Sequence, residues 1–407
     1  DNVIAGDGTI NGDVTVGVYM DITGTLNGSG RIILKNSASL YAGTINNDVL
    51  VTCDKTNTQA NIFSGTLNGT LTLADNASLY LRGELAVTGA VTMGDNTELD
   101  LGGHMLDKSV TLKGSATIGN GTINDGSLAV AEEKTLTLRG NVDGTRTISL
   151  DTDSTLRLTN GTSVANKITG DSSATIVQTG NESATLTGDL SSFTGNVKVE
   201  SGGALNIMNI SEAANLSVAD VTIGNDAIMG VYTGENTQEA NEGTLTIADG
   251  RTLTAGAGAT LNADLVMEDY STLDISGTEG IGGLLMGSAV TMSPGSVALS
   301  AADMAAVGNL GFMQAYDLFS GVDSFSIGGT AYSEITFSDE WVKAAEVFNN
   351  DLFQDGGKEY YLFYSGASQG GTGGKAGTIY LMRLPEPATG TLSLLALAAL
   401  AARRRRK

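Results

Sequence analysis

The sequence predicts an all-β fold, a right-handed parallel β-helix in which coils of about 20 residues stack as a solenoid. The first observation behind this is composition. Of 407 residues, 55 are glycine and only 3 are proline, and 41% are hydrophobic although only 5% are aromatic. This composition is typical of many short strands joined by glycine turns. The second observation is a repeat that runs through residues 1–299.

Each copy of the repeat holds two pairs of apolar residues, the second pair starting eight residues after the first. The members of a pair are two residues apart, so they lie on one face of a strand. Turn formers such as Asp75-Asn76 and Asp95-Asn96 separate the pairs. The clear copies are Leu71, Leu73, Leu79, Leu81; Val91, Met93, Leu99, Leu101; Leu128, Val130, Leu136, Leu138; Ile148, Leu150, Leu156, Leu158; Val197, Val199, Leu205, Ile207; Val221, Ile223, Met229, Val231; and Leu265, Met267, Leu273, Ile275.

One copy cannot bury a core alone, whereas stacked copies can, and this is the logic of a solenoid. A β-sandwich is the alternative, because its strands also alternate and recur about every 8–12 residues. The constant spacing of the second pair and the scarcity of prolines and aromatic residues favour the solenoid.

One segment carries a resemblance to a known repeat. Leu190–Ile207 reads LSSFTGNVKVESGGALNI, and it resembles the autotransporter-associated β-strand repeat. The resemblance covers one copy. It implies a β-helical passenger of the kind displayed at bacterial surfaces.

Residues 300–384 form a second region, because seven of nine phenylalanines, the only tryptophan and six of eleven tyrosines follow residue 300. Helices are predicted over 300–308 and from Ser338 through Trp341 to Phe348. Strands are predicted over 324–327, 359–364 and 378–383, with a glycine-rich loop over 366–377. An open solenoid end exposes strand edges and apolar core. We therefore expect this aromatic α+β region to cap the solenoid.

Residues 385–407 form a third region. After Pro385, Glu386 and Pro387, residues 388–402 carry no charge, and five cations end the chain. The uncharged run predicts a short transmembrane helix, because its leucines fall on every side of a helix. Its roughly 23 Å length is less than the about 30 Å hydrocarbon core, so the anchor is marginal. A soluble Ala/Leu helix with a solvated basic end is the alternative. The anchor leucines are Leu392, Leu394, Leu395, Leu397 and Leu400.

This order of motif, apolar helix and arginine cluster resembles the PEP-CTERM sorting signal. The resemblance implies export, a transient membrane anchor from Leu392 to Ala402, and processing by an exosortase-type enzyme. It makes Pro385, Glu386 and Pro387 the recognition motif. The stop-transfer cluster is then Arg403, Arg404, Arg405, Arg406 and Lys407.

Charge and cysteine content limit the function further. The formal net charge is −23, so the surface repels nucleic acid and anionic lipid and suits a solvated extracellular protein. The single cysteine, Cys53, excludes an internal disulfide and a Cys-based zinc site. We expect that a signal peptide preceding Asp1 has been removed.

Acidic residues are the candidates for catalysis. Glu98, Asp100, Asp151 and Asp153 are predicted to be exposed on or beside strands, and paired carboxylates about 5–10 Å apart perform glycosidase chemistry. Some parallel β-helices cleave polysaccharides with such acids. With 45 acidic residues in the chain, however, neighbouring acids are expected on any solenoid. The sequence therefore assigns no catalytic residue.

Other candidates also have structural interpretations. His104, the only histidine, follows Gly102-Gly103 and is read as a turn residue. No calcium-loop motif and no metal or cofactor site is predicted. Outward threonines are predicted to stack as a ladder, either as a solvated β-face or as a sugar-binding face. They are Thr72, Thr92, Thr111, Thr222 and Thr246.

These observations predict three parts: a parallel β-helix over 1–299, a capping region over 300–384, and a sorting signal over 385–407. The predicted function is that of an exported, non-catalytic structural or adhesive protein at the cell surface or envelope. Its partners would be an exosortase-type enzyme, the membrane and extracellular glycans, with no nucleic acid. The alternative is a β-helical polysaccharide lyase or glycoside hydrolase.

Overall fold

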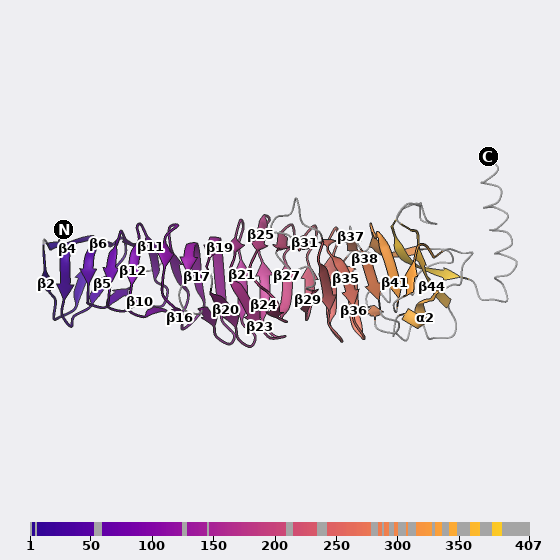
Figure 1. The fold of residues 1–407 in the computed structure, drawn as a ribbon, viewed down its shortest axis with the longest axis horizontal. Helices are drawn as coiled ribbons and strands as arrows, with labels where there is room; N and C mark the ends of the chain where they lie inside the picture. The colour runs from indigo at the N-terminus through magenta and orange to yellow at the C-terminus, as the bar shows by residue number, and fades with distance from the viewer. Residues whose placement is uncertain are drawn as a thin grey trace, which may run out of the picture. The chain divides into compact units, whose positions relative to one another are not determined.

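The structure is a computed structural model, and within each of its two units strands lie side by side in successive coils (Figure 1). The chain divides into two compact units, residues 1–219 with 231–241 and residues 220–230 with 242–407. The residues that the structure describes are 2–4, 6–52, 59–123, 128–144, 146–208, 215–233, 242–277, 284–286, 289–292, 297–299, 307, 315–327, 330–335, 342–347, 359–366 and 377–384.

The first unit is a parallel β-solenoid in which each coil contributes strands to three sides. The first side is a sheet of ten strands. They are β3 (Val14–Val16), β5 (Ile32–Leu34), β7 (Val49–Val51), β10 (Leu71–Leu73), β13 (Val91–Met93), β16 (Val110–Leu112), β18 (Leu128–Val130), β20 (Thr147–Leu150), β23 (Lys167–Gly170) and β26 (Ser192–Phe193).

The second side follows the first in each coil, and the third side completes the coil. Second-side strands are β1 (Asn2–Ile4), β8 (Ala60–Ile62), β11 (Ser78–Leu81), β14 (Thr97–Asp100), β21 (Thr155–Leu158), β24 (Thr175–Gln178) and β27 (Asn196–Val199). Third-side strands are β2 (Gly8–Thr9), β9 (Gly65–Leu67), β12 (Leu85–Val87), β15 (Met105–Leu106), β22 (Ser163–Val164), β25 (Ser183–Leu186) and β28 (Ala204–Ile207). Four long strands serve both of these sides, namely β4 (Tyr19–Asn27), β6 (Ser39–Ile45), β17 (Ala116–Ile123) and β19 (Thr135–Asp143). The unit also holds β29 (Asn215–Val218).

Stacking follows the predicted inward positions. Leu71 is paired in parallel with Val91, and Val91 with Val110. Leu79 is likewise paired with Leu99 on the second side, and all five of these side chains are buried. The parallel solenoid and the alternation of inward and outward side chains are therefore confirmed.

The third side was not predicted. Leu85 and Val87 are buried on β12, although the repeat as written held only two apolar pairs. Its copies also start on different sides: Leu71 lies on the first side, whereas Val197 lies on the second side, paired with Ile176. Because all three sides carry similar inward pairs, spacing alone did not show where a coil begins.

Part of the third side is formed by a sequence motif that the predicted repeat did not include. Gly-Thr-Leu/Ile-Asn occurs at 24–27, 43–46 and 65–68, and the threonines of these copies are stacked in register. Each asparagine bonds the one in the next coil: Asn46 Nδ2 donates to Asn27 Oδ1 at 2.6 Å, and Asn68 Nδ2 donates to Asn46 Oδ1 at 2.7 Å. We call Asn27, Asn46 and Asn68 the amide ladder.

The turns between the first and second sides have the predicted chemistry. Asn76 and Asn96 have positive φ values of 63° and 55°, which asparagine tolerates better than most residues. Side chains in these turns also join successive coils, because Asp75 Oδ1 accepts a hydrogen bond from the N–H of Asp95 at 2.8 Å.

The second unit is also built largely of parallel strands. Within it, β30 pairs with β33, β33 with β36 and β36 with β39. Two further parallel series join β31, β34 and β37 and also β32, β35 and β38. The strands are β30 (Val221–Ile223), β31 (Ile228–Val231), β32 (Thr244–Ile247), β33 (Thr252–Gly256), β34 (Thr260–Asn262), β35 (Asp264–Met267), β36 (Ser271–Gly277), β37 (Leu284–Met286), β38 (Ala289–Met292) and β39 (Val297–Leu299).

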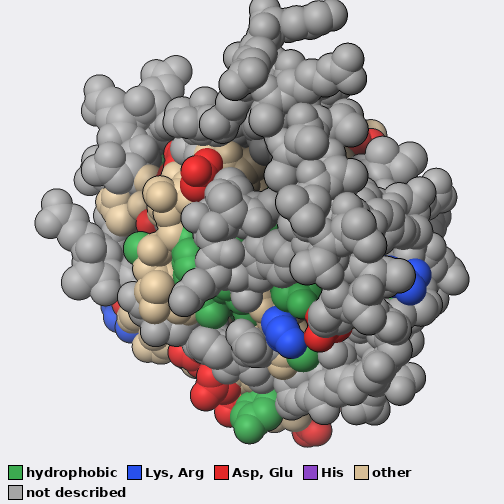
Figure 2. All heavy atoms as spheres, turned by 90° about the vertical axis from the view of Figure 1, so that its right-hand side faces the viewer, with side chains coloured by type: hydrophobic (Ala, Val, Ile, Leu, Met, Phe, Trp, Pro, Cys, Tyr) green, Lys and Arg blue, Asp and Glu red, His purple; other side chains and the backbone are tan. Residues whose placement is uncertain are grey.

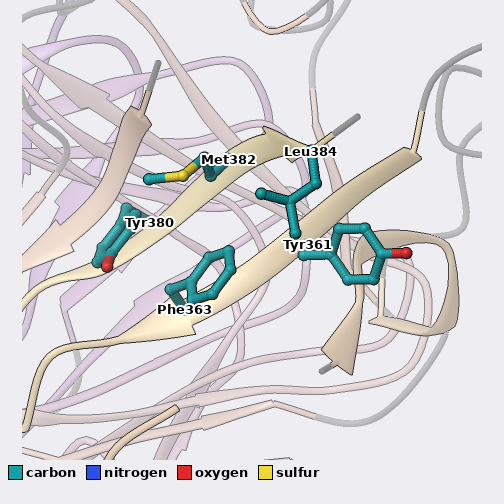
Figure 3. Packing of buried hydrophobic residues seen from close by; sticks show 5 residues of the cluster. All are labelled: Tyr361, Phe363, Tyr380, Met382 and Leu384. Carbon is teal, nitrogen blue, oxygen red and sulfur yellow. The ribbon is translucent and has the colours of Figure 1, made fainter. Parts of the chain in front are cut away.

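After β39 the pairing changes direction. β40 (Ala315–Ser320) pairs in parallel with β37 but antiparallel with β45 (Ile379–Leu384), which pairs antiparallel with β44 (Glu359–Tyr364). β41 (Ser324–Ile327) likewise pairs in parallel with β38 and antiparallel with β42 (Thr330–Tyr332). Figure 3 shows side chains of β44 and β45 that pack as a buried cluster, with the rings of Phe363 and Tyr380 stacked 5.5 Å apart.

The C-terminal predictions have mixed outcomes. The three predicted strands exist, the last starting at Ile379 rather than at residue 378. The helix predicted over 338–348 is only in part correct: Val342–Lys343 is strand β43, and α2 spans Ala344–Val347. Cys53, Trp341, nearly all of 300–308 and the whole of 385–407 lie outside the described residues.

Candidate functional site

The outer face of the second side in the first unit carries aromatic, acidic, basic and hydroxyl side chains, and we call it the second-side face. Four of the seven aromatic residues that precede residue 300 lie on it. Strand alternation places them outward, because their neighbours Met20, Leu40, Ile62 and Leu79 point inward and are buried. The four are Tyr19, Tyr41, Phe63 and Tyr80.

Three of these rings form a row of contacts along the coils. The centroids of Tyr19 and Tyr41 are 5.1 Å apart, and Tyr41 lies on Phe63 at 4.0 Å with an interplanar angle of 11°. Burial and a hydrogen bond to Asp21 raise the pKa of Tyr19. Tyr41 and Phe63 are therefore stacked face to face, whereas Tyr19 is tilted by 49° against Tyr41. These ring contacts stabilise neighbouring coils.

Tyr80 has a different partner. The guanidinium of Arg82 lies over its ring, 4.3 Å from the centroid, in a cation–π contact. Arg82 Nε also donates to Asn61 Oδ1 at 3.0 Å on the preceding coil. The cation is therefore held by two neighbours.

The predicted acids Glu98 and Asp100 meet Arg139, which sequence reasoning had not singled out. Arg139 Nη2 donates to Glu98 Oε1 at 2.5 Å and to Asp100 Oδ2 at 3.2 Å. The other oxygen, Asp100 Oδ1, accepts from the N–H of Gly102 at 2.9 Å. The prediction that Asp100 is exposed was wrong: the residue is 8% exposed, because Arg139 lies against it.

A shallow depression of about 280 Å³ adjoins this cluster. Thr117, Thr137 and Arg157 follow Glu98 in one outward row, each paired with the next across successive strands. Within the described residues, Arg157 has no ion-pair partner, unlike Arg139. The lining residues are Asn96, Thr97, Ser115, Ala116, Thr117, Thr135, Thr137 and Arg157, and we call this feature the threonine depression.

The other predicted acids are elsewhere. Asp151 and Asp153 lie in the exposed turn before β21, three strands from β14 along the sheet. At about 4.8 Å per strand they are roughly 14 Å away. The structure therefore brings together two of the four acids, Glu98 and Asp100.

His104 lies in a turn, as predicted. Its N–H donates to the carbonyl of Leu101 at 2.9 Å, and its carbonyl accepts from the N–H of Thr122 at 3.1 Å. Within the described ranges, no group of three His, Cys, Asp or Glu residues could hold a metal ion.

The threonine ladder is shorter than predicted. Thr72, Thr92 and Thr111 are stacked in register on the first side. Thr222 instead pairs with Thr254 in the second unit, and Thr246 is buried, at 1% exposure. Strand alternation identified an outward residue, but it did not identify the side of the coil.

Sequence reasoning missed the arginines of the second-side face, although the sequence contains a pattern that places them outward. Arg82, Arg139 and Arg157 each follow a buried leucine on a strand, so alternation places them outward. Figure 2 shows another part of the surface, where described acidic, basic and hydrophobic side chains are interspersed. Arg139 on β19 and Arg157 on the adjoining β21 concentrate positive charge locally, in a chain of formal charge −23.

Comparisons with known proteins add no assignment: no family model, no curated protein and no solved structure matches this chain. Of the helices in the described part of the chain, none has the length and apolar character needed to span a membrane.

Proposed function

We propose that this protein is an exported, non-catalytic structural and adhesive protein of the cell surface or envelope, whose second-side face contacts extracellular glycans. The observation that carries the proposal is that outward side chains of the solenoid bond to one another between coils. Rings, amides and ion pairs join the coils, either neighbouring coils, as with Asn46 and Asn27, or coils two apart, as with Arg139 and Asp100. These contacts favour a rigid scaffold over a centre with free reactive groups.

The finer architecture belongs to the same proposal. We take the solenoid as right-handed, in keeping with the strong preference of parallel crossovers. Residues 300–384 act as its cap, because antiparallel partners terminate the parallel pairing at β40 and at β41. The likeness of Leu190–Ile207 to autotransporter-type repeats supports surface display.

Residues 385–407 act as the sorting signal in this proposal. Its resemblance to PEP-CTERM signals supports recognition of Pro385, Glu386 and Pro387 by an exosortase-type enzyme, and a transient transmembrane helix over Leu392–Ala402. Arg403–Lys407 would stay on the cytoplasmic side, because clustered cations resist translocation.

This sorting role is tested by fractionation of cells that produce either the full chain or a chain lacking residues 385–407. We expect the full chain in the envelope and the shortened chain in the medium, with the same β-sheet circular dichroism for both. A shortened chain retained in the envelope would contradict the sorting role. A shortened chain that fails to fold would show that the tail belongs to the folded protein.

A second candidate function is that of a polysaccharide-degrading enzyme, favoured by one observation. Glu98 and Asp100 bond the same nitrogen of Arg139, at 2.5 and 3.2 Å, so those two oxygens lie within about 6 Å. Retaining glycosidases hold their carboxyl groups about 5–5.5 Å apart. Against this candidate, both Asp100 oxygens are already hydrogen-bonded.

A further inference from the structure

We propose that the threonine depression binds a uronate unit of an acidic polysaccharide, with the sugar carboxylate on Arg157 and the sugar hydroxyls on Thr117 and Thr137. This inference rests on the proposed adhesive function and names its class of ligand.

The shape of the depression follows from side-chain size. Thr117 and Thr137 are short, and they lie in one row between the longer Glu98 and Arg157. The volume of the depression, about 280 Å³, is just below the range of about 300–1,000 Å³ that is typical of small-molecule sites. The hollow therefore suits one sugar unit.

Arg157 supplies the charge that selects the ligand. It is exposed, and no described carboxylate forms an ion pair with it. A guanidinium donates two parallel hydrogen bonds to a carboxylate. Arg139, at the border of the depression, is already bonded to Glu98 and Asp100, so Arg157 is the cation left for an anionic ligand.

Some hydroxyl groups of the depression are bonded within the protein, and others are left to bind a ligand. Thr97 Oγ1 is used internally, because it donates to the Gly94 carbonyl at 3.0 Å. Ser115 Oγ accepts from the N–H of Thr135 at 3.1 Å. Thr117 and Thr137 are half-buried, and their hydroxyls have no such internal partner among the described residues. Each can donate and accept, as sugar hydroxyls require.

Because the chain as a whole repels a polyanion, binding of an acidic sugar requires a cation at the site itself. The chain has a formal net charge of −23, which opposes the approach of any polyanion. At physiological salt this repulsion is screened beyond about 8 Å. A carboxylate can then be held by a short charge-assisted contact, and its affinity should fall as salt rises.

Isothermal titration calorimetry of the full chain in detergent tests the inference with three trisaccharides: trigalacturonate, its methyl ester, and a sulfated neutral galactan trisaccharide. We expect trigalacturonate to bind about tenfold more tightly than the ester, since a charged hydrogen-bonded pair is lost. Arg157→Gln should remove about that factor for trigalacturonate and leave binding of the ester unchanged. Tighter binding of the sulfated sugar would overturn the carboxylate assignment.

Lys198→Gln is the matched control. Lys198 is exposed in the same outward row, paired through Val177 with Arg157, but it does not line the depression. Its loss should change the affinity less than about twofold, as expected for a screened distant charge. Equal losses in the two variants would show general charge attraction and overturn the site.

Thr137→Val provides an independent variant that keeps the side-chain volume and removes one hydroxyl. We expect it to weaken trigalacturonate severalfold, with unchanged thermal unfolding. A wild-type chain that binds neutral glycans but not trigalacturonate would overturn this inference alone. A chain that binds no glycan would overturn the proposed adhesive function with it.

Discussion

Arg139 on β19 bonds Asp100 on β14 by passing over the strand between them. Nη2 of Arg139 and Oδ2 of Asp100 are 3.2 Å apart, and the residue on β17 paired with both is Gly119. A Cβ atom built at Gly119 would lie 3.4 Å from Arg139 Nε. The absent side chain thus makes room for an ion pair that joins strands two rungs apart.

Gly119→Val should displace Arg139, because its γ-carbons extend beyond the ordinary contact that a Cβ would make. We expect a loss of about 1 kcal/mol in the free energy of unfolding by urea, the typical worth of such bonds. Gly119→Ala is the control and should be close to neutral. The valine effect should shrink in an Arg139→Ala background; an undiminished effect would mean that the pair is not its cause.

Asp100→Ala should also destabilise the protein. It leaves the N–H of Gly102 without its acceptor in a part-buried bond. We expect a loss of about 1 kcal/mol, the lower end of the cost of an unsatisfied buried group. Asp151→Ala, in an exposed turn, should stay within about 0.5 kcal/mol. Thermal unfolding of the two variants compares them, and equal melting temperatures would contradict the burial of Asp100.

The fate of Asp100 shows what the sequence could reveal. Alternation placed it outward, correctly, because Leu99 and Leu101 are inward and buried. Its burial depends on Arg139, which lies 39 positions later, and on the gap at Gly119. Such a contact follows from the pairing of distant coils, which the spacing of apolar residues does not determine.

The same reason limits the prediction of the solenoid. Inward pairs such as Leu71 and Leu73 were found because alternation is local. The third side was missed because its pairs, such as Leu85 and Val87, resemble those of the other two sides. The threonine depression was missed because it needs Thr117, Thr137 and Arg157 from three coils in one row.

Asn46→Ala should break the amide ladder at its centre. It removes the donor to Asn27 and the acceptor of Asn68, so we expect a loss of about 1–2 kcal/mol. Asn11→Ala is the control, because in this other Gly-Thr-Ile-Asn copy the backbone carbonyl of Asn11 accepts a bond from Ser29 Oγ, and its side chain bonds none of the described residues. Urea unfolding measures both. An Asn46 variant as stable as the Asn11 variant would refute a stabilising ladder.

Asp189 should give the protein an acid-dependent component of stability. Hydrogen bonds from Lys167 and Ser191 lower the pKa of its carboxyl from 3.8 to about 2. The stabilisation is present above about pH 4 and is lost as pH falls toward about 2, because protonation removes the charged acceptor. Asp189→Asn should therefore lower the melting temperature at pH 5 but hardly at pH 2. An equal decrease at both values would contradict the shift.

The most direct test of the adhesive, non-catalytic account is to incubate the full chain with a panel of neutral and acidic polysaccharides. Retention of the protein and release of new reducing ends or unsaturated sugars are measured together. We predict retention on at least one polysaccharide with no product, and the same result for Glu98→Gln. Product that forms with the wild-type chain and disappears in Glu98→Gln would contradict the account and establish an enzyme.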